Sequence, residues 1–186
     1  MRISRDLNAA VETIRQGGLL VYPTEAVFGI GCNPAHSSAV QRLLAAKQRP
    51  AHKGLILLAA NLNQLADYIL PLDRDTLKLL EPTWPGPMTW LLPVRPEVSP
   101  LLRGNHDTLA VRISAHPVCQ ALCQKLGHPL VSTSANPADK EPAKDMEMVS
   151  RYFSGYIDLA LDLPLGGLKK PTEIRDARTG TTLRQG

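Results

Sequence analysis

The chain has 186 residues, of which 44% are hydrophobic and only 4% aromatic, so we expect one core of aliphatic side chains. A net charge of +4 and a pI near 9.1 favour anionic partners, although no run of like charges forms a polybasic tail. The apolar runs are too short to span a membrane, three cysteines give no even-numbered disulfide framework and no signal peptide opens the chain, which together indicate a reduced cytoplasmic protein.

The first half of the chain alternates between strand and helix patterns. Ser4 is expected to cap a helix with apolar residues at helical spacing, which Gly17-Gly18 ends. Ser37 or Ser38 is expected to cap a second helix, which Pro50 terminates. Buried strands are predicted over residues 19–22, 27–31, 55–60 and 88–94, and helical stretches over residues 62–69 and 73–80.

The second half continues the alternation around two irregular segments. Residues 96–104 are predicted to form an exposed connector, and the polar, proline-interrupted residues 137–145 a mobile loop. Strands are predicted over residues 109–113, 130–133, 157–161, 173–176 and 181–184, and helices over residues 116–126 and 146–153. Some strands lie too close together for helical crossovers. We therefore predict a single α/β domain over residues 1–186, with a twisted, mixed parallel and antiparallel sheet and flanking helices.

Three segments carry residue types suited to a polyphosphate and a small polar ligand. Lys47 and Arg49, near the end of a predicted helix, offer a point charge and a planar fork for phosphate or carboxylate oxygens. A predicted strand runs into the hydroxyl and amide cluster 132–136, and Thr24 follows Pro23 at the end of another. Such a set of cations and small donors can hold a polyphosphate without a phosphate-binding glycine loop.

In combination these segments resemble the YrdC-like family of threonylcarbamoyl-AMP synthases, in its short bacterial single-domain form. The similarity runs from about residue 19 to the last residue. Its hallmarks are Tyr22-Pro23-Thr24-Glu25, Lys47-x-Arg49-Pro50, Leu109-Ala110-Val111-Arg112, Ser132-x-Ser134-Ala135-Asn136 and Leu183-Arg184-Gln185-Gly186. The resemblance implies condensation of L-threonine, bicarbonate and ATP into threonylcarbamoyl-AMP and pyrophosphate, with partner proteins transferring the threonylcarbamoyl group to tRNA.

The resemblance also implies a set of site residues. Lys47 and Arg49 are the expected catalytic residues. ATP contacts are expected from Arg49, Thr108, Ser134, Asn136 and Arg184, and L-threonine contacts from Thr24, Arg112, Ser132 and Thr172. No protein metal site is expected, and Mg²⁺ would be held mainly by the ATP phosphates and water. Glu25 is the nearest candidate for a general base, although a capping or structural role is favoured.

Other interpretations remain at this point. The basic charge would also suit an RNA-binding protein acting in ribosome or tRNA maturation, and weak RNA or tRNA binding is expected even of an enzyme. Low aromatic content and the hydroxyl set favour a small ligand. His116, Cys119 and Cys123 invite a zinc interpretation, but both cysteines fall on one apolar helix face. The family's usual Ser-Gly pair is absent after Asn136, so nucleotide contacts from that loop are not expected.

Overall fold

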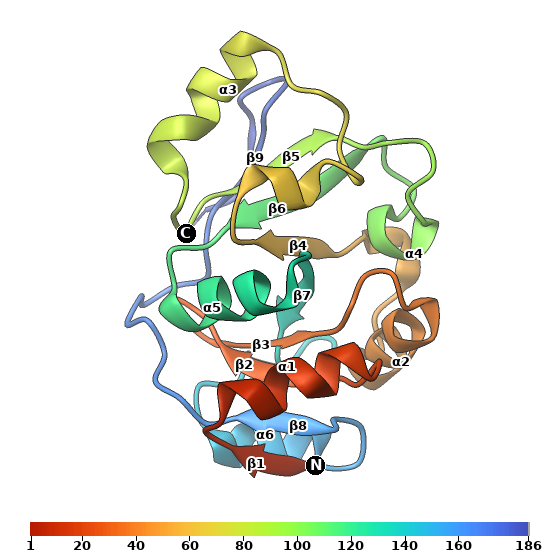
Figure 1. Cartoon of the computed structure of the whole chain (residues 1–186), viewed down its shortest axis with the longest axis vertical. Helices are drawn as coiled ribbons and strands as arrows, with labels where there is room; N and C mark the ends of the chain where they lie inside the picture. The colour runs from red at the N-terminus through yellow and green to blue at the C-terminus, as the bar shows by residue number, and fades with distance from the viewer. Residues whose placement is uncertain (186) are drawn as a thin grey trace.

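Short aliphatic strands form a mixed sheet that runs through the molecule (Figure 1). The computed structural model describes residues 1–185. Within them the strands follow the order β1-β8-β2-β3-β7-β4-β6-β5-β9-β10, and β4 pairs with β6 in parallel and with β7 antiparallel. The strands are β1 (Arg2–Ser4), β2 (Leu20–Pro23), β3 (Phe28–Gly31), β4 (Ile56–Ala59), β5 (Thr89–Pro93), β6 (Thr108–Ile113), β7 (Leu130–Ser134), β8 (Leu159–Leu161), β9 (Ile174–Asp176) and β10 (Thr182–Arg184).

Helices cover both faces of this sheet. The α-helices are α1 (Leu7–Arg15), α2 (Ser37–Lys47), α3 (Arg74–Leu80), α4 (Pro100–Arg103), α5 (Pro117–Leu126) and α6 (Met146–Phe153), and the 3₁₀-helices are η1 (Ala51–Lys53), η2 (Leu62–Leu65) and η3 (Glu81–Thr83). The apolar faces of α1 and α5 share one core cluster, and those of α2 and α6 belong to the other (Figure 1). The α/β class and the mixed, helix-flanked sheet are therefore confirmed. No helix within residues 1–185 has the length and apolar character that crossing a bilayer requires.

Small side chains leave part of one sheet face open. Strand register aligns Ala110 of β6, Ile56 of β4 and Ser132 of β7 in one row, and the neighbouring row carries Arg112 and Leu58. Leu58 packs in the same core cluster as α1 and α5, so both rows face the side that these helices cover. The side chains of Ala110 and Ser132 are short, so this face of the sheet leaves room for a ligand beside α5.

Several predicted boundaries were wrong, each for a local reason. Ser4 does not cap α1, because it ends the short strand β1 beside β8, and the Asp6 side chain accepts the capping bond from Asn8 N at 2.8 Å. Ser37 is the first residue of α2, whose N-cap residue His36 makes no side-chain capping bond. The predicted helical stretch 62–69 is helical only in η2.

Two segments predicted to be irregular have packed portions. The predicted exposed connector 96–104 contains α4, and Val98 and Leu102 within it are buried. The 137–145 loop forms no regular element, but its backbone is anchored: Ala138 N donates to Lys47 O at 2.9 Å and Ala143 N donates to Ala135 O at 2.9 Å. Ala143 is fully buried. These contacts fix the loop against the C-terminal end of α2.

Candidate active site

A cavity of about 360 Å³ lies over the part of the sheet that carries Ala110 and Ser132. Eight of the ten predicted site residues line it, and only Lys47 and Asn136 do not. Among the described residues, no Asp or Glu side chain contributes to the lining. Five cationic side chains do: Arg49, Lys53, Arg103, Arg112 and Arg184. A cavity so composed favours an anionic ligand.

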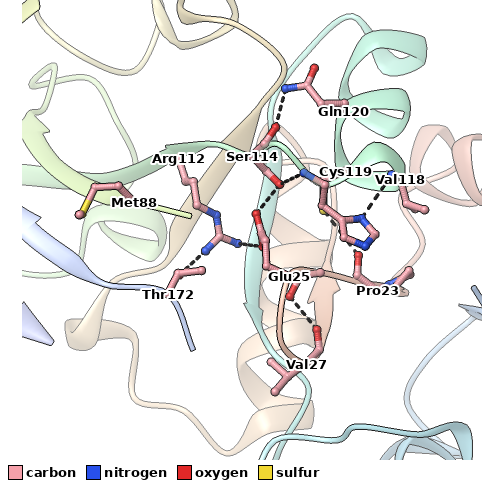
Figure 2. Close-up of polar contacts among 12 residues, drawn as sticks. Pro23, Glu25, Val27, Met88, Arg112, Ser114, Val118, Cys119, Gln120 and Thr172 are labelled. Atoms are coloured by element: carbon pink, nitrogen blue, oxygen red, sulfur yellow. Dashed lines mark hydrogen bonds and ion pairs between the residues drawn. The ribbon is translucent and has the colours of Figure 1, made fainter. Parts of the chain in front are cut away.

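Arg112 is held at one end of the cavity by side chains from two segments. Figure 2 shows its guanidinium between Glu25 and Thr172. Nη2 lies 3.3 Å from Glu25 Oε2, and Nη1 donates to the Thr172 hydroxyl. Arg112 and Glu25 are both buried, and a buried arginine needs such partners. The guanidinium therefore has a fixed orientation before any ligand binds.

Glu25 lies behind Arg112 and does not line the cavity. Its Oε1 accepts a hydrogen bond from the Ser114 hydroxyl at 2.6 Å, and Ser114 Oγ accepts one from His116 N at 3.0 Å (Figure 2). His116 in turn caps α5 through Nδ1, and burial lowers the pKa of its imidazole. These contacts agree better with a structural role for Glu25, which the sequence favoured, than with a role as general base.

Thr172 accepts hydrogen bonds from two residues that are predicted to bind ligands, Arg112 and Arg184. While its hydroxyl accepts from Arg112, its main-chain oxygen accepts from Arg184 Nε at 3.0 Å and Nη2 at 2.6 Å. Burial and the nearby Arg112 charge lower the pKa of Arg184. The segment that carries Thr172 is anchored upstream, where Gly166 N donates to Thr24 O at 3.0 Å. Gly186, which ends the C-terminal motif, lies outside the described residues.

Thr24 is buried against the same end of the cavity. Its hydroxyl donates to Val27 O at 2.6 Å, which leaves the hydroxyl oxygen able to accept a bond from a ligand. Ser132 is also buried and lies on the floor of the cavity. Both placements are compatible with the predicted threonine contacts.

Arg49 is oriented at the other end by a main-chain oxygen. Its Nε and Nη2 donate to Gly54 O at 3.2 and 2.9 Å, so Nη1 remains for a ligand. Burial lowers the pKa of this guanidinium. Thr108 and Ser134 line the cavity alongside Arg49. Arg49 follows the left-handed Gln48 that ends α2 and so lies beyond the helix, rather than in its predicted last turn.

Lys47 has a different environment from Arg49. Its ammonium is buried, with 4% of the residue exposed, and donates to Ser134 O, to Asn136 O at 2.6 Å and to Asn136 Oδ1 at 3.3 Å. The Ser134 hydroxyl donates to the same Oδ1 at 2.6 Å. Burial, and secondarily the charge of Arg49, lower the pKa of Lys47 to about 7. In this structure Lys47 thus fixes the shape of the 134–136 segment, and its direct contact with phosphate stays a prediction.

The sequence interpretation missed three basic residues of the lining: Lys53, Arg103 and His106. They come from η1 and from the end of α4 with the turn that follows. Lys53 follows Lys47-x-Arg49-Pro50 so closely that its charge could have been included. Arg103 lay in the segment 96–104 predicted to be an exposed connector, and His106 lay between that segment and the next predicted strand, so neither gave a signal of a site.

The cysteines near α5 belong to the core. Cys119 and Cys123 are buried on the helix face that packs against the sheet. Burial raises the pKa of both thiols, that of Cys123 to about 12. The described part of the chain shows no group of His, Cys, Asp and Glu side chains arranged to hold a metal.

Comparison with known proteins identifies the family and the fold of this chain. A protein-family model described as "Telomere recombination", named for Sua5, yciO and yrdC, matches residues 12–186. The chain belongs to this family. A curated threonylcarbamoyl-AMP synthase of Halorhodospira halophila is 51% identical, with 96% of this chain and 93% of the relative covered. One from Nitrosococcus oceani is 52% identical, with 94% and 95% covered.

Solved structures of family members match the fold over nearly the whole chain. Sua5 of P. abyssi, solved with L-threonine, matches with a TM-score of 0.85 at 31% identity, covering 94% of this chain and 53% of the other. This chain therefore spans about half of that protein. YciO of E. coli matches with a TM-score of 0.84 at 29% identity, covering 100% and 93%.

Proposed function

We propose that this protein condenses L-threonine, bicarbonate and ATP to threonylcarbamoyl-AMP and pyrophosphate, for the modification of tRNA. The observation that carries the proposal is the cavity with five cationic side chains and, among the described residues, no carboxylate in its lining. Such a lining suits ATP. The curated relatives that bear the name of this activity match nearly the whole chain, and they favour an enzyme over the RNA-binding alternative.

The buried end of the cavity is the proposed threonine site. Arg112, already oriented by Glu25 and Thr172, would bind the threonine carboxylate through its guanidinium. Thr24 and Ser132 would bind the polar atoms of the amino acid. Sua5 of P. abyssi, solved with L-threonine, supports an amino-acid site in this fold.

The reaction proceeds in two steps. The threonine amine attacks the carbon of bicarbonate, and loss of water leaves a carbamate. A carbamate oxygen then attacks the α-phosphorus of ATP, the bond from that phosphorus to the bridging oxygen of the β-phosphate breaks, and pyrophosphate leaves with the electron pair. Arg49 and Arg184 would stabilise charge on the phosphates, and the Thr108 hydroxyl would add a neutral donor. The Ser134 hydroxyl, which donates to Asn136 Oδ1 in the ligand-free protein, would turn toward the phosphates to add a second. Asn136 lies outside the lining and would act by holding Ser134, so positioning and electrostatics supply the catalysis.

Lys47 would support this site through hydrogen bonds. Its three bonds to Ser134 and Asn136 hold the segment that presents the Ser134 hydroxyl to the cavity. Mg²⁺ would enter on the ATP phosphates, since the cavity offers no lining carboxylate among the described residues to hold it. We also propose that residues 1–186 form one catalytic domain in the cytoplasm, with separate threonylcarbamoyl-transfer proteins as partners and only weak RNA or tRNA binding.

The test is pyrophosphate release from ATP by the purified protein, with mass spectrometry of the nucleotide product. Release should require both threonine and bicarbonate, and threonylcarbamoyl-AMP should be detected. Arg49→Ala serves as the control for a contaminating ATPase, because it should lose the coupled release while remaining folded. Threonine-independent release, or none from folded protein with all three substrates, would refute the proposed reaction.

A further inference from the structure

Buried side-chain polar atoms are normally hydrogen-bonded, but within residues 1–185 four of them have no partner: Tyr22 Oη, Glu25 Oε2, Thr89 Oγ1 and Arg112 Nε. Glu25 and Arg112 form the ion pair at the buried end of the cavity. Thr89 of β5 lies opposite Arg112 in the antiparallel register of β5 and β6. Tyr22 is on β2, and three other strands lie between it and β6. Its hydroxyl therefore needs an explanation of its own.

The Tyr22 ring lies across the neighbouring strand β3, where two glycines leave room for it. Tyr22 pairs with Gly29, and Gly29 pairs with Ser134 of β7, so the three residues share one face of the sheet. A Cβ at Gly29 would lie 3.3 Å from Tyr22 Cζ. A Cβ at Gly31 would lie 2.9 Å from Tyr22 Cε1 and 2.3 Å from the main-chain oxygen of residue 131, so only glycine fits there. The ring thus extends over β3 toward β7.

Ser132 is the polar residue of β7 beside this ring. The register of β3 and β7, extended by one residue, places Ser132 opposite Gly31 on the same face of the sheet. Ser132 lines the cavity, whereas Tyr22 is fully buried and does not. Burial raises the pKa of the Tyr22 phenol well above its usual range, and the nearby Ser132 hydroxyl partly opposes this rise. The phenol therefore keeps its proton and remains a donor next to Ser132.

We propose that Tyr22 is a positioning residue for the threonine site, and that its hydroxyl donates to Ser132 Oγ when threonine binds. The inference rests on the proposed function for the contact between Ser132 and threonine. A serine hydroxyl has one donor and two acceptor positions, so a bond from Tyr22 leaves the Ser132 proton for the ligand. A hydroxyl that accepts one hydrogen bond also donates a stronger one. Tyr22 would thus act on threonine without touching it.

The variant Tyr22→Phe tests the proposal, because it removes the hydroxyl and keeps the ring that packs on β3. Calorimetric titration with L-threonine should show roughly fivefold weaker binding, the loss expected for one hydrogen bond, with ATP affinity within about twofold of wild type. Tyr156→Phe is the matched control. Tyr156 is exposed and does not line the cavity, so its substitution should change neither affinity.

A double-mutant cycle with Ser132→Ala shows whether Tyr22 acts through Ser132. If it does, the variant that carries both substitutions should bind threonine no more weakly than Ser132→Ala alone. Additive losses from the two substitutions would overturn the proposal, since they would mean that Tyr22 acts independently of Ser132. Unchanged threonine affinity in folded Tyr22→Phe would overturn it as well.

Thermal melting separates positioning from a structural role. The Tyr22 hydroxyl has no partner in the ligand-free protein, so Tyr22→Phe should melt at or above the wild-type temperature, while the stabilisation by added threonine should shrink. A lower melting temperature with an unchanged response to threonine would show a structural role alone. Wild-type protein that binds threonine but makes no adenylate would refute the proposed reaction, and the cycle would still decide the role of Tyr22. Failure of wild type to bind threonine would overturn both.

Discussion

The two ends of the cavity differ in the kind of group that holds the arginine there. At the inner end, the Arg112 guanidinium faces the Glu25 carboxylate at 3.3 Å, and both side chains are at least 90% buried. At the rim, Arg49 is held by the main-chain oxygen of Gly54. Arg184 is also held by a main-chain oxygen, that of Thr172, but the Thr172 hydroxyl binds Arg112, so Arg184 lies beside the inner end. Carbonyl oxygens orient a guanidinium without cancelling its charge.

This difference assigns a type of ligand to each end. An arginine already paired with a carboxylate adds little net charge, so it favours a small ligand of matching geometry that carries charges of both signs, as an amino acid does. Cations oriented by dipoles alone keep their net charge and attract a polyanion. The comparison therefore supports threonine beside Arg112 and the phosphates beside Arg49, and it can be tested by changing one end at a time.

The largest effect is expected at the phosphate end. Arg49→Ala should lower kcat/KM for ATP by about 10²–10³-fold, the range found when a preorganised transition-state donor is removed. The fold should persist, because Gly54 O can then bond water at the half-buried site. Circular dichroism and thermal melting check the fold. Turnover near wild type in the folded variant would remove Arg49 from the phosphate site.

Substitution at the inner end should separate the two substrates. Arg112→Ala should raise KM for threonine by about 100-fold, as expected when a charged bidentate contact of nearly 3 kcal/mol is lost, and change KM for ATP far less. It should also lower the free energy of unfolding by about 3–5 kcal/mol, because Glu25 is left buried without its partner. An unchanged KM for threonine would exclude Arg112 from the amino-acid site.

The double variant Arg112→Ala with Glu25→Gln distinguishes binding from stability. Removing the unpaired carboxylate should restore part of the lost unfolding free energy, and threonine affinity should remain low. Recovery of threonine affinity together with stability would show that the single variant acted through the fold alone.

A pH dependence is expected from Lys47, whose pKa is lowered to about 7. The neutral amine has one donor fewer than the ammonium, so the bonds to Ser134 and Asn136 weaken as pH rises through about 7. Activity should fall to about one tenth of its plateau by pH 8. Lys47→Met should have low activity without this transition. A flat wild-type profile from pH 6 to 9 would contradict the role of the ammonium.

Unfolding would not explain that loss of activity. Because burial places the Lys47 pKa below its unfolded value, the folded state binds fewer protons between about pH 7 and the usual lysine range. This group therefore makes the folded state more stable, relative to the unfolded chain, as pH rises through that window. Melting temperatures recorded alongside the activity check the sign, with Lys47→Met as the reference.

The smallest effect is expected from Glu25→Gln. Glutamine retains an acceptor for the Ser114 hydroxyl but gives up the ion pair with Arg112. KM for threonine should rise about fivefold, which corresponds to about 1 kcal/mol, and kcat should change little. A general base would behave otherwise, so a loss of kcat by several orders of magnitude with unchanged KM would show that Glu25 transfers a proton.

Local signals predicted the elements that border the cavity and eight of the residues that line it. The Lys47-x-Arg49-Pro50 run and the hydroxyl cluster after β7 depend on residue types alone, and both were found. The partners of Lys47 could not be predicted, because they are carbonyl oxygens on residues 134 and 136, far along the chain. The rim was missed for a similar reason: Gly54 and Gly104 meet only in the folded protein.

Element boundaries show the same limit on a smaller scale. Strand β1 has three residues and exists because β8 pairs with it, so the local pattern favoured a cap at Ser4 instead. Val98 and Leu102, buried within a predicted exposed connector, pack against a core formed by distant strands. Tertiary contacts decided these segments, and no short window of sequence contains them.

The measurement that tests the two-ended cavity most directly is a crystal structure with L-threonine and a non-hydrolysable ATP analogue. The threonine carboxylate should contact Arg112 and the terminal phosphates should lie against Arg49, with the α-phosphate between the two ends. Terminal phosphates against Arg112, or the threonine carboxylate on Arg49, would contradict the assignment of charge that distinguishes the two ends.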